Sequence, residues 1–222
     1  LDDDRALQDT DLYTDRIYDF DDGVRLTTDL NRYAVNMNRP RLNDGSVDEY
    51  DDEDALRTFL KGMTPSWDAS TDEADSLLTY YDEYHRLLRA SIEMIKQRRG
   101  HVFLLTGHSM NSEPDDNTPD TGRRPDINVG TENGDAAPRS VVEAFASVFE
   151  DADLSVKVDE PYPGGFTTRH YAVGDPDVHG IQLEVNKRLY MDERSFTCEE
   201  EGIRRIQGLV RRAVSKVLAT VH

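Results

Sequence analysis

The chain has 222 residues, which is enough for one domain with a substantial hydrophobic core, and no shift in composition marks a second domain. Its 45 acidic and 26 basic residues give a formal net charge of −19, which disfavours nucleic acids and anionic membranes as partners. The single cysteine, Cys198, excludes an intramolecular disulfide and any zinc motif that needs several cysteines. We therefore predict a single domain over residues 1–222, in which His, Asp and Glu would hold any metal.

Aspartate dominates the acidic charge, and lysine is rare: it occurs only at Lys61, Lys96, Lys157, Lys187 and Lys216. A dispersed carboxylate surface with little lysine keeps a protein hydrated where salt screens ordinary surface charges. The sequence contains no run of about 18 apolar residues. Its first residues, LDDDRALQDTD, are acidic where a signal peptide is basic and then apolar. We expect a cytoplasmic protein from a salt-rich cell, as in a halophilic archaeon.

The first half of the chain is predicted to form a short helix, a strand and two longer helices: Thr10–Phe20, Gly23–Asp29, Asp48–Leu60 and Ala74–Arg99. In the last of these, apolar residues recur at steps of three and four, which is typical of an amphipathic helix. Gly100 ends that helix.

An apolar strand, Val102–Leu105, is predicted to run directly into Gly107, His108 and Ser109. Polar groups at the carboxyl end of a buried strand are where α/β sheets bind ligands. The next segment, residues 111–138, is rich in Pro, Gly, Asp and Asn and is predicted to be a long loop. Loops of that length in a compact domain are commonly functional or disordered.

The rest of the chain is predicted to form a helix, a strand, a glycine-bearing loop, a second strand and a closing helix, within Arg139–Asp151, Leu154–Val158, Tyr162–Asp175, Gly180–Glu193 and Glu199–Val221. Strands that alternate with helices predict an α/β fold. We expect a mixed, mostly parallel sheet flanked by helices.

The segment GIQLEVNKRLYMDE, Gly180–Glu193, has a carboxylate in the middle of a strand otherwise patterned for burial. Alternation places Ile181, Leu183 and Val185 on one face of the strand, and Gln182, Glu184 and Asn186 on the other. Two interpretations are open. Either Glu184 is solvated on the wet face of a half-buried strand, or it points into a cleft as an acid, base or ligand.

Histidines and carboxylates in this chain could form a metal-dependent hydrolytic site. A divalent metal supplies a strong nucleophile by lowering the pKa of its bound water to about 7, and typical sites have three protein ligands and a nearby carboxylate base. Among the six histidines, His108 and His170 are singled out because each is predicted in a glycine-containing loop beside a strand end. All parts but one could come from His108, Glu184 and one acidic residue among Asp9, Asp11 and Asp15.

Five arginines lie in predicted loops and could bind substrate carboxylates with a bidentate guanidinium: Arg32, Arg39, Arg123, Arg124 and Arg169. Ordinary surface pairing in a very acidic protein is the alternative for any one of them.

Several segments resemble the N-formylglutamate amidohydrolase (deformylase) family in order and approximate spacing: DTDLYTDRIYDF, DLNRYAVNMNRP, GHSM, RRPDINVGT, and GGFTTRHY followed by HGIQLEVNKRLYMDE. The resemblance implies the fold of zinc-dependent exopeptidases and carboxypeptidase-like amidohydrolases, and a reaction that releases formate and glutamate in histidine degradation. It also implies a divalent metal, expected to be zinc, with His108 and Asp11 as ligands and Glu184 as general base. We predict that substrate is bound by Arg32, Arg39, Arg169 and His170.

Three departures from the family pattern are visible. The family has a strand ending in Pro-His-Ser-Gly before the first helix, whose histidine we take as the remaining metal ligand, and this chain starts at Leu1, after that point. Thr106 stands where an acidic residue is usual, and Asn36 replaces an aspartate. Changes of this kind around metal ligands tune the orientation of the ligands.

The leading prediction is metal-dependent hydrolysis of N-formyl-L-glutamate or a related N-acyl acidic amino acid. A peptidoglycan-type amidase on the same fold is an enzymatic alternative, which the acidic N-terminus disfavours. The alternative from another class is a degenerate, metal-free relative that binds an acidic metabolite or a protein partner without chemistry. The missing histidine favours that alternative.

Overall fold

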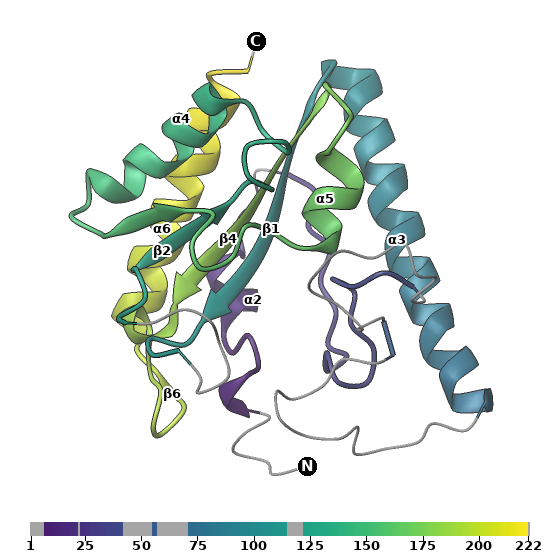
Figure 1. The fold of residues 1–222 in the computed structure, drawn as a ribbon, viewed down its shortest axis with the longest axis horizontal. Helices are drawn as coiled ribbons and strands as arrows, with labels where there is room; N and C mark the ends of the chain where they lie inside the picture. The colour runs from purple at the N-terminus through teal and green to yellow at the C-terminus, as the bar shows by residue number, and fades with distance from the viewer. Residues whose placement is uncertain (1–6, 22, 42–54, 57–70, 115–121, 222) are drawn as a thin grey trace.

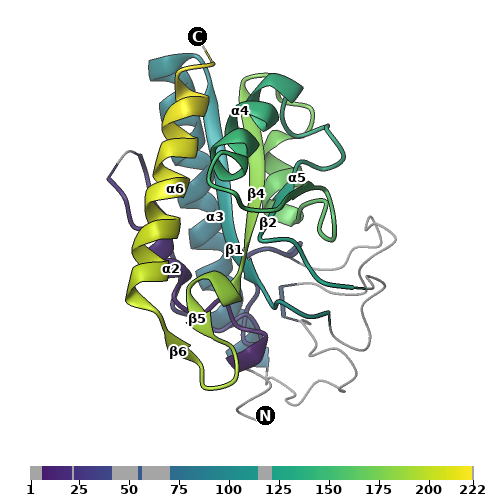
Figure 2. The ribbon, with the colours of Figure 1, turned by 90° about the vertical axis from the view of Figure 1, so that its left-hand side faces the viewer.

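The computed structural model describes residues 7–21, 23–41, 55–56, 71–114 and 122–221. Figure 1 shows a central sheet between two layers of helices. Helices α4 (Arg139–Glu150) and α6 (Glu200–Leu218) lie on one side, and α5 (Phe166–Ala172) and the long helix α3 (Thr71–Arg99) lie on the other. A short helix, α2 (Thr14–Ile17), packs against α6 and the sheet (Figure 2).

The main sheet has four strands in the order β1-β4-β2-β3, with bounds Val102–Met110, Val178–Asn186, Ile127–Gly130 and Val156–Val158. β1 pairs with β4 in parallel, β2 pairs with β3 in parallel, and β2 pairs with β4 antiparallel. A one-turn 3-10 helix, Lys187–Leu189, leads from β4 to the small hairpin of β5 (Met191–Asp192) and β6 (Thr197–Cys198). The predicted mixed, mostly parallel sheet flanked by helices is therefore confirmed.

The main core fills the space between one face of the sheet and helices α4 and α6. Alternation along β4 directs Ile181, Leu183 and Val185 into this core, where each is fully buried. Burying an aliphatic side chain of this size contributes about 1.5–3 kcal/mol. The apolar faces of α4 and α6 meet these residues with Phe145, Phe149, Ile206 and Val210.

The opposite face of β4 is covered as well, which decides between the two interpretations of Glu184. α5 packs over β4 and β1, and Glu184 is only 7% exposed. The interpretation of Glu184 as a solvated residue is therefore wrong. The strand is buried on both faces, as expected where helices cover both sides of a sheet.

Two early elements differ from their predictions. The predicted helix Thr10–Phe20 is reduced to α2, because Tyr13 has a φ of 62° and its hydroxyl donates to the carbonyl of Phe196. The predicted strand Gly23–Asp29 is wrong: the described residues there have no strand conformation, and Val24 is 51% exposed. An apolar alternation of two residues buries too little surface to hold a strand in place.

Two elements in predicted loops were missed. β2 lies inside the predicted loop 111–138, and α5 lies inside Tyr162–Asp175. β2 has only four residues and carries Asn128 at its second position, so it lacks the apolar run of a typical buried strand. The buried face of α5 includes Thr167 and Thr168, so its pattern is not that of an apolar helix stripe.

The remaining predicted elements fall close to their observed bounds. The predicted helices Ala74–Arg99, Arg139–Asp151 and Glu199–Val221 correspond to α3, α4 and α6. The predicted strand Val102–Leu105 continues to Met110, because pairing with β4 extends as far as Met110 with Asn186. The predicted helix Asp48–Leu60 lies mostly outside the described residues. Within those residues, no helix is long and apolar enough to cross a membrane.

Candidate active site

A row of polar side chains lies on the α5-facing side of the sheet. Strand pairing sets His108 of β1 beside Glu184 of β4, and Glu184 beside Asn128 of β2. Residues paired across neighbouring strands project on the same face, so these three side chains share one surface. The hydroxyls of Thr106 and Thr168 lie 3.2 Å apart, which shows that this face is the one that α5 covers.

Asp11 binds both the side chain of His108 and the backbone beside it. Its Oδ2 lies 2.9 Å from His108 Nδ1, and its Oδ1 accepts from the Ser109 amide at 2.7 Å and from the Ser109 hydroxyl at 2.8 Å. These bonds fix the carboxylate and, through it, the plane of the imidazole. An acceptor at Nδ1 selects the tautomer with its proton on that atom.

A continuous chain of hydrogen bonds connects His108 to Glu184 through two amides. Asn38 Oδ1 accepts from the Thr167 backbone N–H at 2.8 Å, so Asn38 Nδ2 is the donor to His108 Nε2 at 3.1 Å and to Gln182 Oε1 at 3.2 Å. Gln182 Nε2 then donates to Glu184 Oε1 at 2.9 Å. The network assigns His108 Nε2 as an acceptor and therefore favours a neutral imidazole.

The charged groups of the site shift one another's pKa. Burial raises the pKa of Glu184 to about 7, and the nearby His108 and Arg32 oppose that rise. Burial alone would also raise the pKa of Asp11, but His108 and Arg32 together lower it well below its usual range. Burial alone would lower the pKa of His108, but Asp11 and Glu184 together raise it, and the positive charge of Arg32 opposes that rise.

The protonation and exposure of these groups suit proton transfer. A carboxylate with a pKa near 7 can both accept and release a proton at neutral pH. The side chains of His108 and Asp11 remain 23% and 27% exposed, whereas Glu184 is buried. The arrangement can therefore activate and protonate a ligand bound at His108.

Helices α3 and α5 hold the segment that carries Asn38. His85 of α3 lies 3.0 Å from the Met37 carbonyl through Nε2, and its Nδ1 lies 2.9 Å from the Tyr171 hydroxyl. A carbonyl only accepts, so His85 Nε2 carries the proton, and burial lowers the pKa of His85 to about 4. The Tyr81 hydroxyl donates to the Arg39 carbonyl at 2.8 Å. The long helix thus positions the segment as well as covering the sheet.

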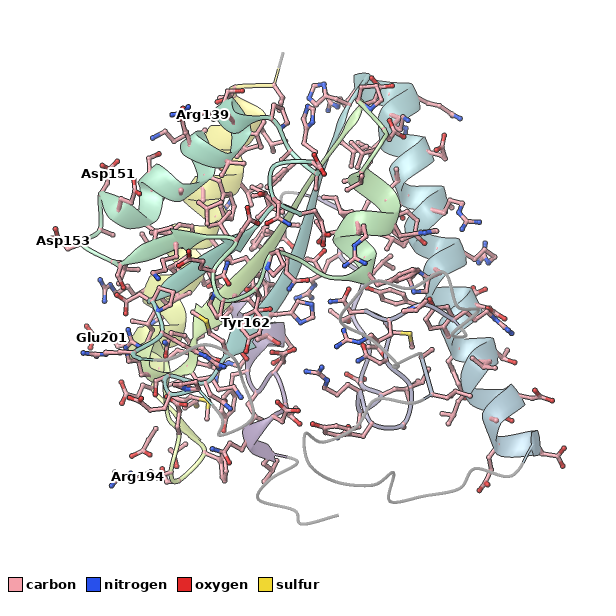
Figure 3. All side chains as sticks on the ribbon, viewed as in Figure 1. Arg139, Asp151, Asp153, Tyr162, Arg194 and Glu201 are labelled. Carbon is pink, nitrogen blue, oxygen red and sulfur yellow. The ribbon has the colours of Figure 1, made fainter. Side chains whose placement is uncertain are left out.

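Asn128 ties the loop after β3 to the sheet. Its side chain accepts from the Tyr162 amide at 2.8 Å and donates to the Tyr162 carbonyl at 3.1 Å. The guanidinium of Arg124 lies over the Tyr162 ring, 5.4 Å from its centre. Figure 3 labels Tyr162 near the centre of the view, whereas the other labelled residues lie toward its left-hand edge: Arg139, Asp151, Asp153, Arg194 and Glu201.

The structure places the predicted site residues unequally. Asp11 and Glu184 lie close to His108, and Arg32 is near enough to influence the pKa of all three. Of the other acidic candidates, Asp9 accepts from the Tyr33 hydroxyl and Asp15 is exposed.

The two predicted loop histidines lie in regular elements. His108 is part of β1 and His170 is part of α5. The His170 ring stacks on Phe166 at 4.9 Å and meets Tyr171 edge-on at 4.8 Å. Among the residues that the structure describes, no hydrogen bond or ring contact links His170 to His108 or Glu184.

Asn38 and Gln182 were missed from the sequence. Gln182 could have been found, because it shares a strand face with Glu184 two residues away. Asn38 carries no such local signal, since its bonds reach residues 70 and 144 positions away.

The predicted metal site is incomplete in the described part of the chain. No group of three His, Cys, Asp or Glu side chains there is arranged to hold a metal ion. Both oxygens of Asp11 already bind His108 and Ser109. His and Asp are suitable donor types, but His108 and Asp11 alone do not make a metal centre. A metal would need at least one further donor from outside the described part of the chain.

Tyr18 packs closely against the backbone under His108. A Cβ at Gly107 would lie 2.5 Å from the Tyr18 ring, and the Tyr18 hydroxyl donates to the His108 carbonyl at 2.9 Å. We expect Gly107→Ala to lower the free energy of unfolding by about 1–3 kcal/mol, because the ring must move away. Chemical denaturation would measure the change.

Gly208→Ala is the matched control for this prediction. Gly208 lies in α6, and no atom lies within 4 Å of the position that an added methyl group would occupy, so the substitution should raise the free energy of unfolding slightly. Equal stability of Gly107→Ala and the unmodified protein would show that Tyr18 adapts freely.

The fold and site define a mixed α/β protein with an acid–base group on one face of its sheet. The model of the family described as N-formylglutamate amidohydrolase matches residues 1–191, and the chain belongs to that family. It is 28% identical over 229 residues to an N-formylglutamate deformylase from Pseudomonas aeruginosa, a match that covers 97% of this chain and 84% of the relative. A deformylase of the same name from Pseudomonas putida is 27% identical, with 97% and 83% covered.

Solved structures share the fold. The crystal structure of N-formylglutamate amidohydrolase from Ralstonia eutropha aligns with a TM-score of 0.81 and 17% identity, and the alignment covers 99% of this chain and 86% of that one. A gene product of Agrobacterium tumefaciens aligns with a TM-score of 0.57 and 19% identity over 86% of this chain and 68% of that one. These similarities establish the fold, and the family model establishes the family.

Proposed function

We propose that this protein hydrolyses the amide bond of N-formyl-L-glutamate, or of a related N-acyl acidic amino acid, to release formate and glutamate or their counterparts. Family membership and two relatives named N-formylglutamate deformylase support this substrate. The observation that carries the proposal is Glu184, a buried carboxylate on the polar face of the sheet beside His108.

Glu184 is the proton shuttle in the proposed reaction. Water attacks the formyl carbon and gives a proton to Glu184, which is supported by a pKa near 7. The bond between carbon and nitrogen then breaks as the proton passes from Glu184 to the leaving amine. Gln182 donates to Oε1 of Glu184, and Asn38 links Gln182 to His108. The two amides therefore fix the position of the Glu184 carboxylate relative to His108.

Arginines are proposed to bind the substrate carboxylates. Arg32 lies near Asp11, His108 and Glu184, and a guanidinium matches a carboxylate with two parallel hydrogen bonds. Arg39 follows Asn38 directly, and Arg169 lies on α5, whose first turns contact Asn38 through Thr167. His170 remains a proposed substrate residue at the aromatic end of α5.

A divalent metal, expected to be zinc, remains part of the proposal, with His108 and Asp11 as two of its ligands, although the described donor set does not complete a site. We also propose that the fold is related to those of zinc exopeptidases and carboxypeptidases. A role in histidine degradation and a location in a salt-rich cytoplasm are further parts of the proposal.

Metal content provides a direct test of His108. Protein purified in high salt is expected to contain a divalent metal that His108→Ala loses, because an imidazole nitrogen is a principal zinc ligand. Elemental analysis of both proteins measures this, with His170→Ala as a histidine control that should retain the metal. Equal metal content in His108→Ala would remove His108 from the site.

Formate release from N-formylglutamate tests the function as a whole. Purified protein in molar salt should release formate and glutamate in equal amounts. The rate with N-formylglutamine tests whether the second carboxylate is needed, and the rate with N-acetylglutamate tests whether the acyl group must be formyl. The second candidate function, binding of an acidic metabolite without hydrolysis, is favoured by the donor set of the described residues, which does not complete a metal site. Saturable binding of N-formylglutamate with no formate produced would support that candidate and contradict hydrolysis.

A further inference from the structure

Glu132 is a second carboxylate on this side of the sheet, and most of its side chain is shielded from solvent. It follows β2 in the chain, its side chain is 11% exposed, and its Oε2 accepts from Arg169 Nε at 2.8 Å. Among the described atoms, its Oε1 is buried without a hydrogen-bond partner. Leaving a buried acceptor without a hydrogen bond is unfavourable, so packing alone does not explain a glutamate at this position.

The backbone around Glu132 is built to hold it. Its own amide donates to the Pro163 carbonyl at 2.6 Å, and it adopts a φ of 53°, which is uncommon for a residue other than glycine. Any side chain at Gly164 would overlap Glu132 Oε1, so the glycine makes room for the carboxylate. The preceding residue, Thr131, is bound to Asp159 through both its amide and its hydroxyl.

The next glycine connects this pair to the acid–base network. A Cβ at Gly165 would lie 2.5 Å from Asn38 Nδ2 and 2.7 Å from Gln182 Oε1. Gly164 therefore packs against Glu132, and Gly165 packs against Asn38 and Gln182. The ion pair of Glu132 and Arg169 lies beside the proposed reaction site.

Arg169 and Arg39 lie near one another beside Glu132. Burial lowers the pKa of Arg169, and the nearby positive charge of Arg39 lowers it further, which places two guanidiniums near one another. Burial raises the pKa of Glu132 to about 7, and the neighbouring Asp159 and Asp135 add to the rise. The guanidiniums of Arg169 and Arg39 each present parallel N–H groups that match the two oxygens of a carboxylate.

We propose that Glu132 is the positioning residue for Arg169, and that it holds the guanidinium so that its Nη edge binds the second carboxylate of a dicarboxylic substrate. A guanidinium held through Nε is fixed in rotation, and its Nη pair is an edge that matches a planar carboxylate. The proposal rests on the proposed function and adds a specificity element to it. Glu132 thereby determines the preference for acidic over amidated or neutral N-acyl amino acids.

Two substitutions of Glu132 separate positioning from charge. Glu132→Gln keeps an oxygen that accepts from Arg169 Nε and removes a negative charge, so KM for N-formylglutamate should stay within about threefold of the original value or fall. Glu132→Ala removes the acceptor, so KM should rise about tenfold or more with kcat changed far less. The ratio of kcat/KM for N-formylglutamate over N-formylglutamine should fall by a similar factor only in Glu132→Ala.

Asp126→Asn is the control for general loss of stability. Asp126 pairs with Arg188 at 2.8 Å, and its side chain is 18% exposed, so it is a carboxylate in a similar environment outside the proposed site. Asp126→Asn should lower the melting temperature and leave the substrate ratio unchanged. Glu132→Ala would overturn the proposal if it behaved like this control. Equal losses in Glu132→Gln and Glu132→Ala would overturn positioning through Nε.

Glutarate binding tests the inference independently of catalysis. In the Glu184→Gln background, glutarate affinity measured by calorimetry should fall about tenfold with Glu132→Ala and persist with Glu132→Gln, while the affinity for butyrate should not respond. This pattern without formate release from the unsubstituted protein would support the site and contradict hydrolysis. The inference would be overturned if the protein hydrolysed N-formylglutamate but Glu132→Ala left the ratio of kcat/KM for N-formylglutamate over N-formylglutamine unchanged. It would also be overturned if glutarate did not bind at all.

Discussion

Glu184→Gln is expected to lower the rate of formate release from N-formylglutamate by about 100-fold or more, with the fold retained. The amide keeps the size of the carboxylate and can still bond to Gln182, but it cannot hold the transferred proton. Single-turnover kinetics with circular dichroism of both proteins would measure the change. Glu143→Gln, which alters an exposed carboxylate paired with Arg139 on α4, should leave the rate unchanged.

The pH profile gives the same prediction a second readout. Burial raises the pKa of Glu184 to about 7, and the base must be unprotonated, so kcat/KM should rise as the pH increases through about 7. In Glu184→Gln this rising limb should disappear. Near-full activity of Glu184→Gln, or an unchanged profile, would assign the proton transfer to another group.

The fold is expected to depend strongly on salt. With a formal net charge of −19, the surface carboxylates repel one another, and the screening length grows from about 3 Å at 1 M salt to about 10 Å at 0.1 M. The melting temperature measured by circular dichroism should fall steeply from molar to tenth-molar KCl, and the protein should be largely unfolded at the lower end.

Sucrose separates screening from a general effect of solutes. Sucrose stabilises compact states by exclusion from the protein surface but does not screen charge. Replacing KCl with sucrose should therefore restore much less of the melting temperature than KCl does. A melting temperature that stays constant as salt is removed would contradict the inference of a salt-rich cell.

The elements that could be predicted from the sequence are those whose pattern is set by burial against one neighbour. α3, α4 and α6 each bury an apolar face, and the alternation of Ile181, Leu183 and Val185 defines β4. The fold class follows from the order of these elements. β2 was not recognisable, because a four-residue strand containing Asn128 depends on its pairing with β4 and β3 for stability.

The candidate site was predicted in part, for a related reason. His108 and Glu184 lie on strands, where the alternation of faces is visible in the sequence. Asn38 enters the network through hydrogen bonds to distant residues, which no local pattern encodes. Glu132 would have been noticed at the end of a strand had β2 been identified, since polar residues after a strand of an α/β sheet are candidates for ligand binding.

The position of β1 at one end of the strand order has a consequence for solubility. An edge strand presents unpaired N–H and C=O groups that can recruit a strand from another molecule. Asp11 occupies one of these groups by accepting the Ser109 amide with the same carboxylate that holds His108. A carboxylate at this end of the strand order also disfavours pairing with the same strand of a second copy. Loss of Asp11 would therefore remove a barrier to edge-to-edge aggregation along with the imidazole's support, and the two defects would arise together.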